Sequence, residues 1–196
     1  YELYKVTAFE EEGGAAEDFI SHLPITLDSS SSGVQFYACI LLTVHDAVLS
    51  NLQSEDGQKV ANDVYMEIAN AVIKKMKQDI IDYEGFEDCD EAEYRKLAQL
   101  WLDFGLKRKY VKRPVMTSLY SATLYGITNQ IMKDTIIPLR FDVIRGDIDE
   151  HPLGDNQTQF QAARYLAQTI WDALHTVLSE AMKAMNVLRQ TAEVMA

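Results

Sequence analysis

The sequence predicts a mainly α-helical fold of the α+β class, with one small β element near its start. Apolar residues recur at helical spacing along most of the 196 residues, a pattern typical of helices with one buried face. The short run 23–28, Leu-Pro-Ile-Thr-Leu-Asp, is instead β-prone. The composition, with 47% hydrophobic and 24% charged residues, is that of an ordinary globular protein.

The first part of the chain is expected to place the β element between a loop and a helix. Residues 1–10 fit either a strand or a helix end, and residues 11–18, with Glu-Glu-Gly-Gly, fit a loop. The run 23–28 is expected to be a strand that ends in an acid, and a helix is expected over 34–53. Because an isolated strand pair is marginally stable, the strand is expected to pair with strands outside this chain, which leaves the fold incomplete here.

Further helices are expected over 58–81, 91–105 and 114–136. Gly105 suits the C-terminal cap of the second of these, because glycine adopts the left-handed conformation without steric cost. Pro114 is expected in the first turn of the third, where its missing N–H is harmless.

The last part of the chain is expected to be a polar loop followed by one long helix. The loop contains Pro138, Gly146, Pro152 and Gly154, and the helix runs from about Gln157 to the end. No apolar run approaches the ~20 residues that would cross a bilayer, so a membrane is not expected among the partners.

The charge is uneven along the chain. Net charge is −12 with a pI near 4.7, which argues against a surface that coats nucleic acid. However, residues 107–113, Lys-Arg-Lys-Tyr-Val-Lys-Arg, carry five positive charges, so subtracting them leaves −17 on the rest of the chain. Such a concentrated basic stretch suits local binding of a triphosphate or a short piece of backbone.

Asp28 stands where the β-prone run ends and a serine-rich turn begins. A carboxylate at the end of a strand is held rigidly yet exposed, and it suits Mg²⁺, which favours one or two carboxylates with further oxygens. The residues alone also fit an N-cap or Asx-turn aspartate without any metal.

Arg108, Lys112, Met116 and Tyr120 are spaced by four. In a continuous helix they would spread over roughly 120° and about 18 Å of rise. The two cations would suit a triphosphate, and the methionine and tyrosine would suit a base and a sugar. The alternative is a solvated basic face above two core residues.

Two segments in order resemble motifs of the phage-type single-subunit RNA polymerases. Residues 27–35, Leu-Asp-Ser-Ser-Ser-Ser-Gly-Val-Gln, are similar to motif A of that family. Residues 112–117, Lys-Arg-Pro-Val-Met-Thr, followed by Tyr120, are similar to motif B on the fingers helix. Because flanking segments also fit in order, the resemblance covers essentially the whole chain.

The resemblance implies a two-metal nucleotidyl transfer that adds rNTPs to an RNA 3′ end. Asp28 would bind both catalytic Mg²⁺ ions, and the carbonyl of Ser29 would add a ligand to one of them. Arg108 and Lys112 would hold the phosphates of the incoming nucleotide, and Lys112 would also act on the leaving pyrophosphate.

The same resemblance implies contacts to the sugar, the base pair and the template. Tyr120 would help choose ribose, Met116 would lie near the nascent base pair, and Tyr65 would lie near the template. The implied partners are a DNA template, nascent RNA and rNTPs.

Two serines depart from the family pattern. Ser121 follows Tyr120 where the family usually has glycine, which allows an unusual backbone angle. Ser29 also stands at a position that is commonly glycine, although its carbonyl is unchanged.

The resemblance divides the chain into a palm segment, residues 1–55, and a fingers region, residues 56–196. The family's third motif, which carries a second metal-binding aspartate on a palm hairpin, does not occur in this sequence. We therefore expect further chain or a second polypeptide to supply that aspartate, and activity only when the palm is completed. The expected location is the cytoplasm of a phage-infected bacterium, with association with the virion as a second option.

Two other functions compete with this interpretation. One is a non-catalytic subunit that keeps the polymerase fold and binds nucleic acid or a partner chain, which the acidic surface would suit. The other is a related DNA polymerase, which ranks lower because family A DNA polymerases typically follow the motif A aspartate with Tyr-Ser.

Overall fold

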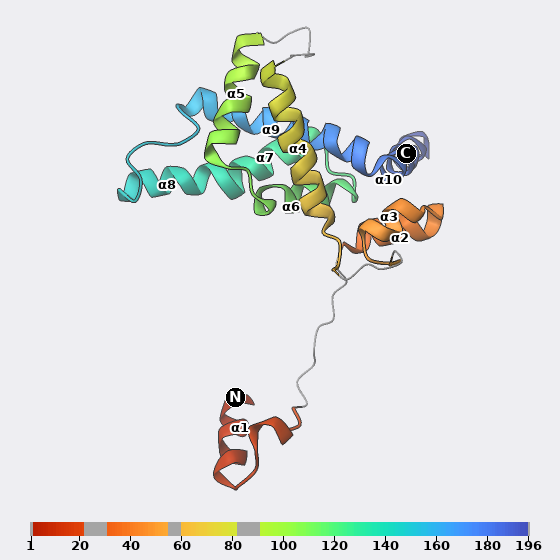
Figure 1. The fold of residues 1–196 in the computed structure, drawn as a ribbon, viewed down its shortest axis with the longest axis vertical. Helices are drawn as coiled ribbons and strands as arrows, with labels where there is room; N and C mark the ends of the chain where they lie inside the picture. The colour runs from red at the N-terminus through yellow and green to blue at the C-terminus, as the bar shows by residue number, and fades with distance from the viewer. Residues whose placement is uncertain (1, 22–30, 55–59, 82–90, 196) are drawn as a thin grey trace. The chain divides into compact units, whose positions relative to one another are not determined.

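The computed structural model describes residues 2–21, 31–54, 60–81 and 91–195. The chain divides into two compact units, Tyr1–Ser30 and Ser31–Ala196. Within the described ranges every regular element is a helix, as the ribbon shows (Figure 1). The mainly helical prediction is therefore confirmed, whereas the expected strand over 23–28 lies outside the described residues.

The first unit contains α1 (Glu2–Glu11) and a short 3₁₀ helix, η1 (Ala16–Asp18). Of the two options for residues 1–10, the helix is the one found. Phe9 and Phe19 meet edge to face with ring centroids 5.7 Å apart. A Cβ at Gly14 would lie 2.2 Å from the Phe9 ring, so any larger residue there would require the ring to move.

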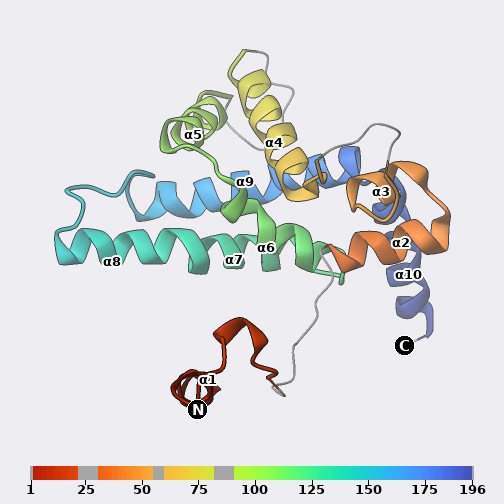
Figure 2. The ribbon, with the colours of Figure 1, turned by 60° about the horizontal axis from the view of Figure 1, so that its bottom comes forward.

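The second unit is built around α9 (Asn156–Val177), whose buried face is the longest in the fold. It packs against α4 (Val64–Ile81), α5 (Glu91–Phe104) and α7 (Leu124–Ile131) (Figure 2). The Trp101 indole donates to the Ala162 carbonyl at 2.9 Å, which ties α5 to α9. One continuous core thus sets the relative positions of these helices.

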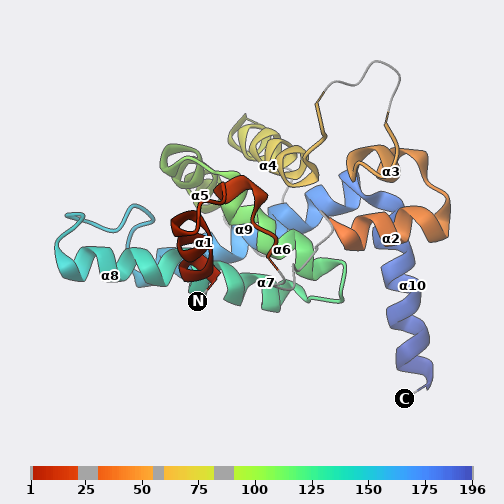
Figure 3. The same ribbon diagram turned by 90° about the horizontal axis from the view of Figure 1, so that it is seen from below.

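Two of the expected long helices are interrupted. The helix expected over 34–53 is split into α2 (Ser32–Leu41) and α3 (Val44–Leu49), because Leu42 adopts a left-handed conformation with φ 53°. The expected C-terminal helix is split at the buried Leu178, where the backbone has φ −116° and ψ 47°. α10 (Ser179–Met195) then turns away from α9 (Figure 3) and packs against α2.

The region from 108 to 145 differs most from the expectation. Pro114 lies inside α6 (Arg108–Ser118) rather than in its first turn, and the helix expected over 114–136 is divided among α6, α7 and a π-helical segment. The expected loop at Pro138 is instead the first turn of α8 (Ile137–Arg145). Before it lies a π-helical segment, η2 (Met132–Ile136), with the Ile137 amide bonded to the Met132 carbonyl. A wider turn is suited to this place because Pro138 has no N–H to donate to the preceding turn.

Two expected helices are found close to their predicted bounds. α5 ends at Phe104, and Gly105 follows in the left-handed conformation with φ 81°, as predicted. α4 begins at Val64 and ends at Ile81, so the expected helix 58–81 is shorter at its start. None of the helices that the structure describes is long and apolar enough to cross a bilayer.

A buried polar group also ties α4 to α9. Asp79, only 1% exposed, accepts from the Tyr165 hydroxyl at 2.8 Å and from Lys75 at 2.5 Å. Burial, and then the charge of Asp79, raises the pKa of Tyr165 well above its usual range. The hydroxyl therefore stays protonated and remains a donor to the carboxylate.

We expect Tyr165→Phe to lower the free energy of unfolding by about 1–3 kcal/mol, because it leaves a buried carboxylate without one of its donors. Tyr125→Phe removes a hydroxyl from a side chain that is 72% exposed, and should change stability by less than ~0.5 kcal/mol. Urea unfolding followed by circular dichroism measures both variants. Equal changes in the two variants would show that the Asp79–Tyr165 hydrogen bond contributes nothing to the free energy of unfolding.

Candidate functional site

The basic stretch lies on α6, which presents two different faces. Its buried face comprises Val111, Pro114, Val115 and Ser118. The Ser118 hydroxyl donates to the Pro114 carbonyl at 2.7 Å, within the last turn. Because the buried residues follow helical spacing, Lys112 and Met116 are left on the exposed side, and Arg108 lies half-buried at the edge of the buried face.

Arg108 is held by two residues at the start of α4. Its Nε donates to Asp63 Oδ2 at 2.5 Å. Its guanidinium carbon lies 4.9 Å from the centroid of the Tyr65 ring, which is within the range of a cation–π contact. Only 6% of Tyr65 is exposed, so its ring forms a fixed support beneath the arginine.

The Asp63 carboxylate is ionised under ordinary conditions. Its partial burial would raise its pKa, but the hydrogen bond from Arg108 and those from the backbone amides of Met66 and Tyr65 outweigh this and lower the pKa below the usual value. The carboxylate therefore keeps its negative charge beside Arg108 at neutral pH.

The other residues of the four-residue spacing are exposed. Lys112 forms no ion pair within the described part of the chain, and Met116 is 44% exposed. Tyr120 is 67% exposed and lies beyond the end of α6, so the helix does not continue through all four residues.

The segment after α6 forms a Schellman motif. The Ala122 amide bonds to the Thr117 carbonyl at 3.1 Å, and the Ser121 amide bonds to the Ser118 carbonyl at 3.2 Å. Ser121 occupies the left-handed position of this motif with φ 72°, where glycine is usual. The motif sets the direction in which the chain leaves Tyr120.

Tyr120 meets the start of α2. Its hydroxyl lies 3.4 Å from the Ser32 hydroxyl. A Cβ added at Gly33 would lie 3.2 Å from Leu119 and 3.4 Å from the Tyr120 hydroxyl, so glycine permits this close approach. Gln35 donates to the Ser50 carbonyl at 2.8 Å and links α2 to α3. The segment that resembles motif A thus contacts the segment that resembles motif B.

The two proposed metal ligands, Asp28 and Ser29, lie outside the described residues. Among the residues that the structure does describe, no group of three or more His, Cys, Asp or Glu side chains could hold a metal ion. The metal assignment therefore stays a prediction from the sequence.

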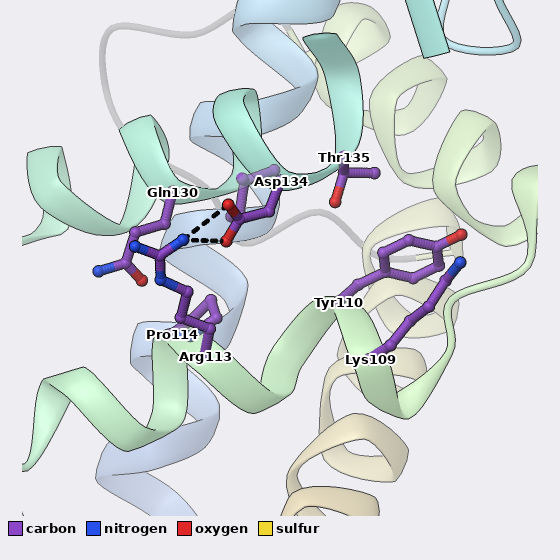
Figure 4. Close-up of a pocket in the computed structure, with 8 residues that line it drawn as sticks. Lys109, Tyr110, Arg113, Pro114, Gln130, Asp134 and Thr135 are labelled. Atoms are coloured by element: carbon purple, nitrogen blue, oxygen red, sulfur yellow. Dashed lines mark hydrogen bonds and ion pairs between the residues drawn. The ribbon is translucent and has the colours of Figure 1, made fainter. Parts of the chain in front are cut away.

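A second group of basic residues lines a shallow pocket of about 200 Å³ between α6 and the α7–η2 segment. Figure 4 shows Arg113 pointing to Asp134, with both carboxylate oxygens 2.7 Å from the same guanidinium nitrogen. Lys109 lies on the other side, over the Tyr110 ring. The two arginines of the stretch are therefore each paired with an acid on a neighbouring element.

Asp63 and Asp134 were not anticipated as partners of these arginines. Asp63 had a local signal, because an aspartate directly before an apolar helical run is a typical N-cap. Asp134 had none, since its position opposite Arg113 depends on how α6 packs on η2.

A family model described as DNA-dependent RNA polymerase matches residues 1–196. The chain belongs to this family. It is 34% identical to the DNA-directed RNA polymerase of Enterobacteria phage T3 over 188 residues, which cover 89% of this chain and 20% of that protein. T7 RNA polymerase from Escherichia phage T7 is 31% identical over 188 residues, which again cover 89% of this chain and 20% of that protein.

Organellar polymerases are also similar to this chain. The mitochondrial DNA-directed RNA polymerase 1 of Arabidopsis thaliana is 43% identical over 117 residues, which cover 60% of this chain and 11% of that protein. The chain thus spans about a fifth, or less, of the length of the curated relatives named here.

We expect Ser121→Gly to stabilise the protein by about 1 kcal/mol, because serine at a positive φ carries strain that glycine does not. Ser121→Ala should bring no such gain, since alanine keeps a Cβ in the same left-handed conformation. Thermal unfolding of the two variants checks this. A gain of equal size with alanine would mean that the serine hydroxyl, rather than the backbone angle, is what destabilises the protein at this position.

Proposed function

We propose that this chain forms palm and fingers parts of a phage-type single-subunit DNA-dependent RNA polymerase. In this proposal residues 1–55 belong to the palm and residues 56–196 to the fingers. The polymerase extends the 3′ end of an RNA with rNTPs that pair with a DNA template. The phage relatives support activity in the cytoplasm of an infected host.

The observation that carries the proposal is the contact between the two motif-like segments. Tyr120 and Leu119 at the end of α6 meet Ser32 and Gly33 at the start of α2. Asp28 belongs to the same motif-like segment, three positions before Ser31 in the sequence. This supports one site that combines the acid of the first segment with the cations of the second.

The donor set of Asp28 fits a hard divalent cation. The Asp28 carboxylate and the Ser29 carbonyl offer the oxygen ligands that Mg²⁺ prefers. A Mg²⁺ ion held by these oxygens would supply charge stabilisation during an in-line displacement. A second aspartate would come from another part of the polymerase or from a second polypeptide.

The side chains on α6 would hold the incoming nucleotide. Arg108 and Lys112 neutralise the triphosphate, and Lys112, which has no acid partner among the described residues, is available to the leaving pyrophosphate. Met116 lies towards the base pair, and Tyr120 lies by the sugar. Because Tyr65 is largely buried, any contact with the template is confined to its small exposed edge.

We expect Asp28→Ala to reduce RNA synthesis by at least about a thousandfold, because several kcal/mol of transition-state stabilisation depend on the metal. The measurement is primer extension on an RNA–DNA scaffold by the complete polymerase, with Mg²⁺ and rNTPs. Asp149→Ala, which removes an exposed acid from a surface loop, should leave the rate unchanged.

Retained synthesis with Asp28→Ala would contradict the proposal and favour the alternative, a non-catalytic subunit that binds nucleic acid or a partner chain. The charge of −17 outside the basic stretch is the observation that favours this alternative. Extension with dNTPs in preference to rNTPs would instead indicate a DNA polymerase.

A further inference from the structure

We propose that Asp63 is a positioning residue that fixes the direction of Arg108 before the nucleotide arrives. The inference rests on the proposed function, in which Arg108 binds the triphosphate. It adds a residue that was assigned no role in the site, and it gives a physical reason for the geometry around Arg108.

The two oxygens of Asp63 perform different tasks. Oδ1 accepts from the Tyr65 and Met66 amides at 3.1 and 3.2 Å, so Asp63 caps the N-terminus of α4. Oδ2 accepts from Arg108 Nε. Because the cap fixes the carboxylate to a buried helix, the second oxygen points in a set direction and is not free to follow the arginine.

Arg108 is constrained from two sides. Asp63 binds the inner edge of its guanidinium through Nε, and the Tyr65 ring lies against its face. Within the ranges that the structure describes, the terminal Nη nitrogens of Arg108 have no hydrogen bond. They are therefore left for a ligand, and a planar pair of N–H donors matches two oxygens of a phosphate.

Pre-orientation matters because a long side chain loses rotamer freedom when it binds a ligand. In this arrangement much of that freedom is already lost in the free protein, so binding of the nucleotide costs less. Asp63 has an opposing effect, since its negative charge weakens the attraction between Arg108 and phosphate. If pre-orientation dominates, removing the charge of Asp63 weakens binding of the nucleotide. If competition with phosphate dominates, removing that charge strengthens binding, so the measurement distinguishes the two.

The test is Asp63→Asn in the complete polymerase. Asparagine remains a good N-cap, but once its oxygen caps α4 its amide nitrogen faces Arg108 and cannot accept from Nε. We expect the KM for rNTPs to rise about three- to fivefold, the effect of losing one partly exposed charge pair. The kcat should be nearly unchanged, because the lost interaction serves binding of the nucleotide in its ground state.

Asp155→Asn is the matched control. Asp155 caps α9 by accepting from the Thr158 amide at 2.8 Å, and it forms no ion pair among the described residues. This change also removes one capping charge, so it measures how much the loss of that charge alone lowers the melting temperature, and it should leave KM unchanged. If Asp63→Asn folds poorly, Asp63→Ser keeps a capping oxygen that is too short to reach Arg108, and the same rise in KM is expected.

A double-mutant cycle with Arg108→Ala separates this inference from the proposed function. If Arg108→Ala leaves KM unchanged, Arg108 does not bind the nucleotide and that part of the proposed function fails. If Arg108→Ala raises KM but Asp63→Asn leaves it unchanged or lowers it, the positioning role of Asp63 is overturned. The inference holds if Asp63→Asn raises KM in the parent protein and adds nothing when Arg108 is already alanine.

Discussion

Burial of α9 is the constraint on which the rest of the larger unit depends. Its apolar side contacts α4, α5, α6 and α7, and the Trp101 and Tyr165 bonds fix two of these contacts with directional hydrogen bonds. The distance between the start of α4 and the start of α6 follows from this packing. Asp63 and Arg108 are 45 positions apart in the chain, so they meet only because both helices are held on the same core.

A second constraint acts at the opposite end of α6. Two serines with positive φ, Ser31 and Ser121, stand just before α2 and just after Tyr120. Each redirects the backbone within a single residue, which a helical or extended residue cannot do. The α2 terminus can thereby approach Tyr120 closely, provided that Gly33 carries no side chain. Local backbone strain is tolerated here because buried neighbours such as Val34 and Leu119 hold both segments in place.

The sequence was informative wherever local chemistry decided the structure. Gly105 ended α5 as expected, and the apolar spacing of 91–105 located that helix closely. Prediction from the sequence failed where tertiary packing prevailed over local preference. Pro114 is accommodated inside α6 by a buried face that continues on both sides of it, and the break at Leu178 places that leucine in the core, at the junction of α9 and α10.

The candidate site was only partly predictable for the same reason. The exposed positions of Lys112, Met116 and Tyr120 fit the expected spacing, but the expected helix stops before the tyrosine. The acids that pair with Arg108 and Arg113 come from other elements. Periodicity within one helix carries no information about such partners, because they depend on which helices become neighbours.

These pairings change how the basic stretch should behave as a polyelectrolyte. Its sequence presents five cations, but Asp63 and Asp134 each form an ion pair with one of the two arginines. A phosphate backbone lying across α6 would therefore displace fewer condensed counterions than five free cations would, and its binding there would respond less steeply to added salt. The stretch is accordingly better suited to a short, highly charged ligand that engages free donor groups at close range than to non-specific adhesion along a duplex.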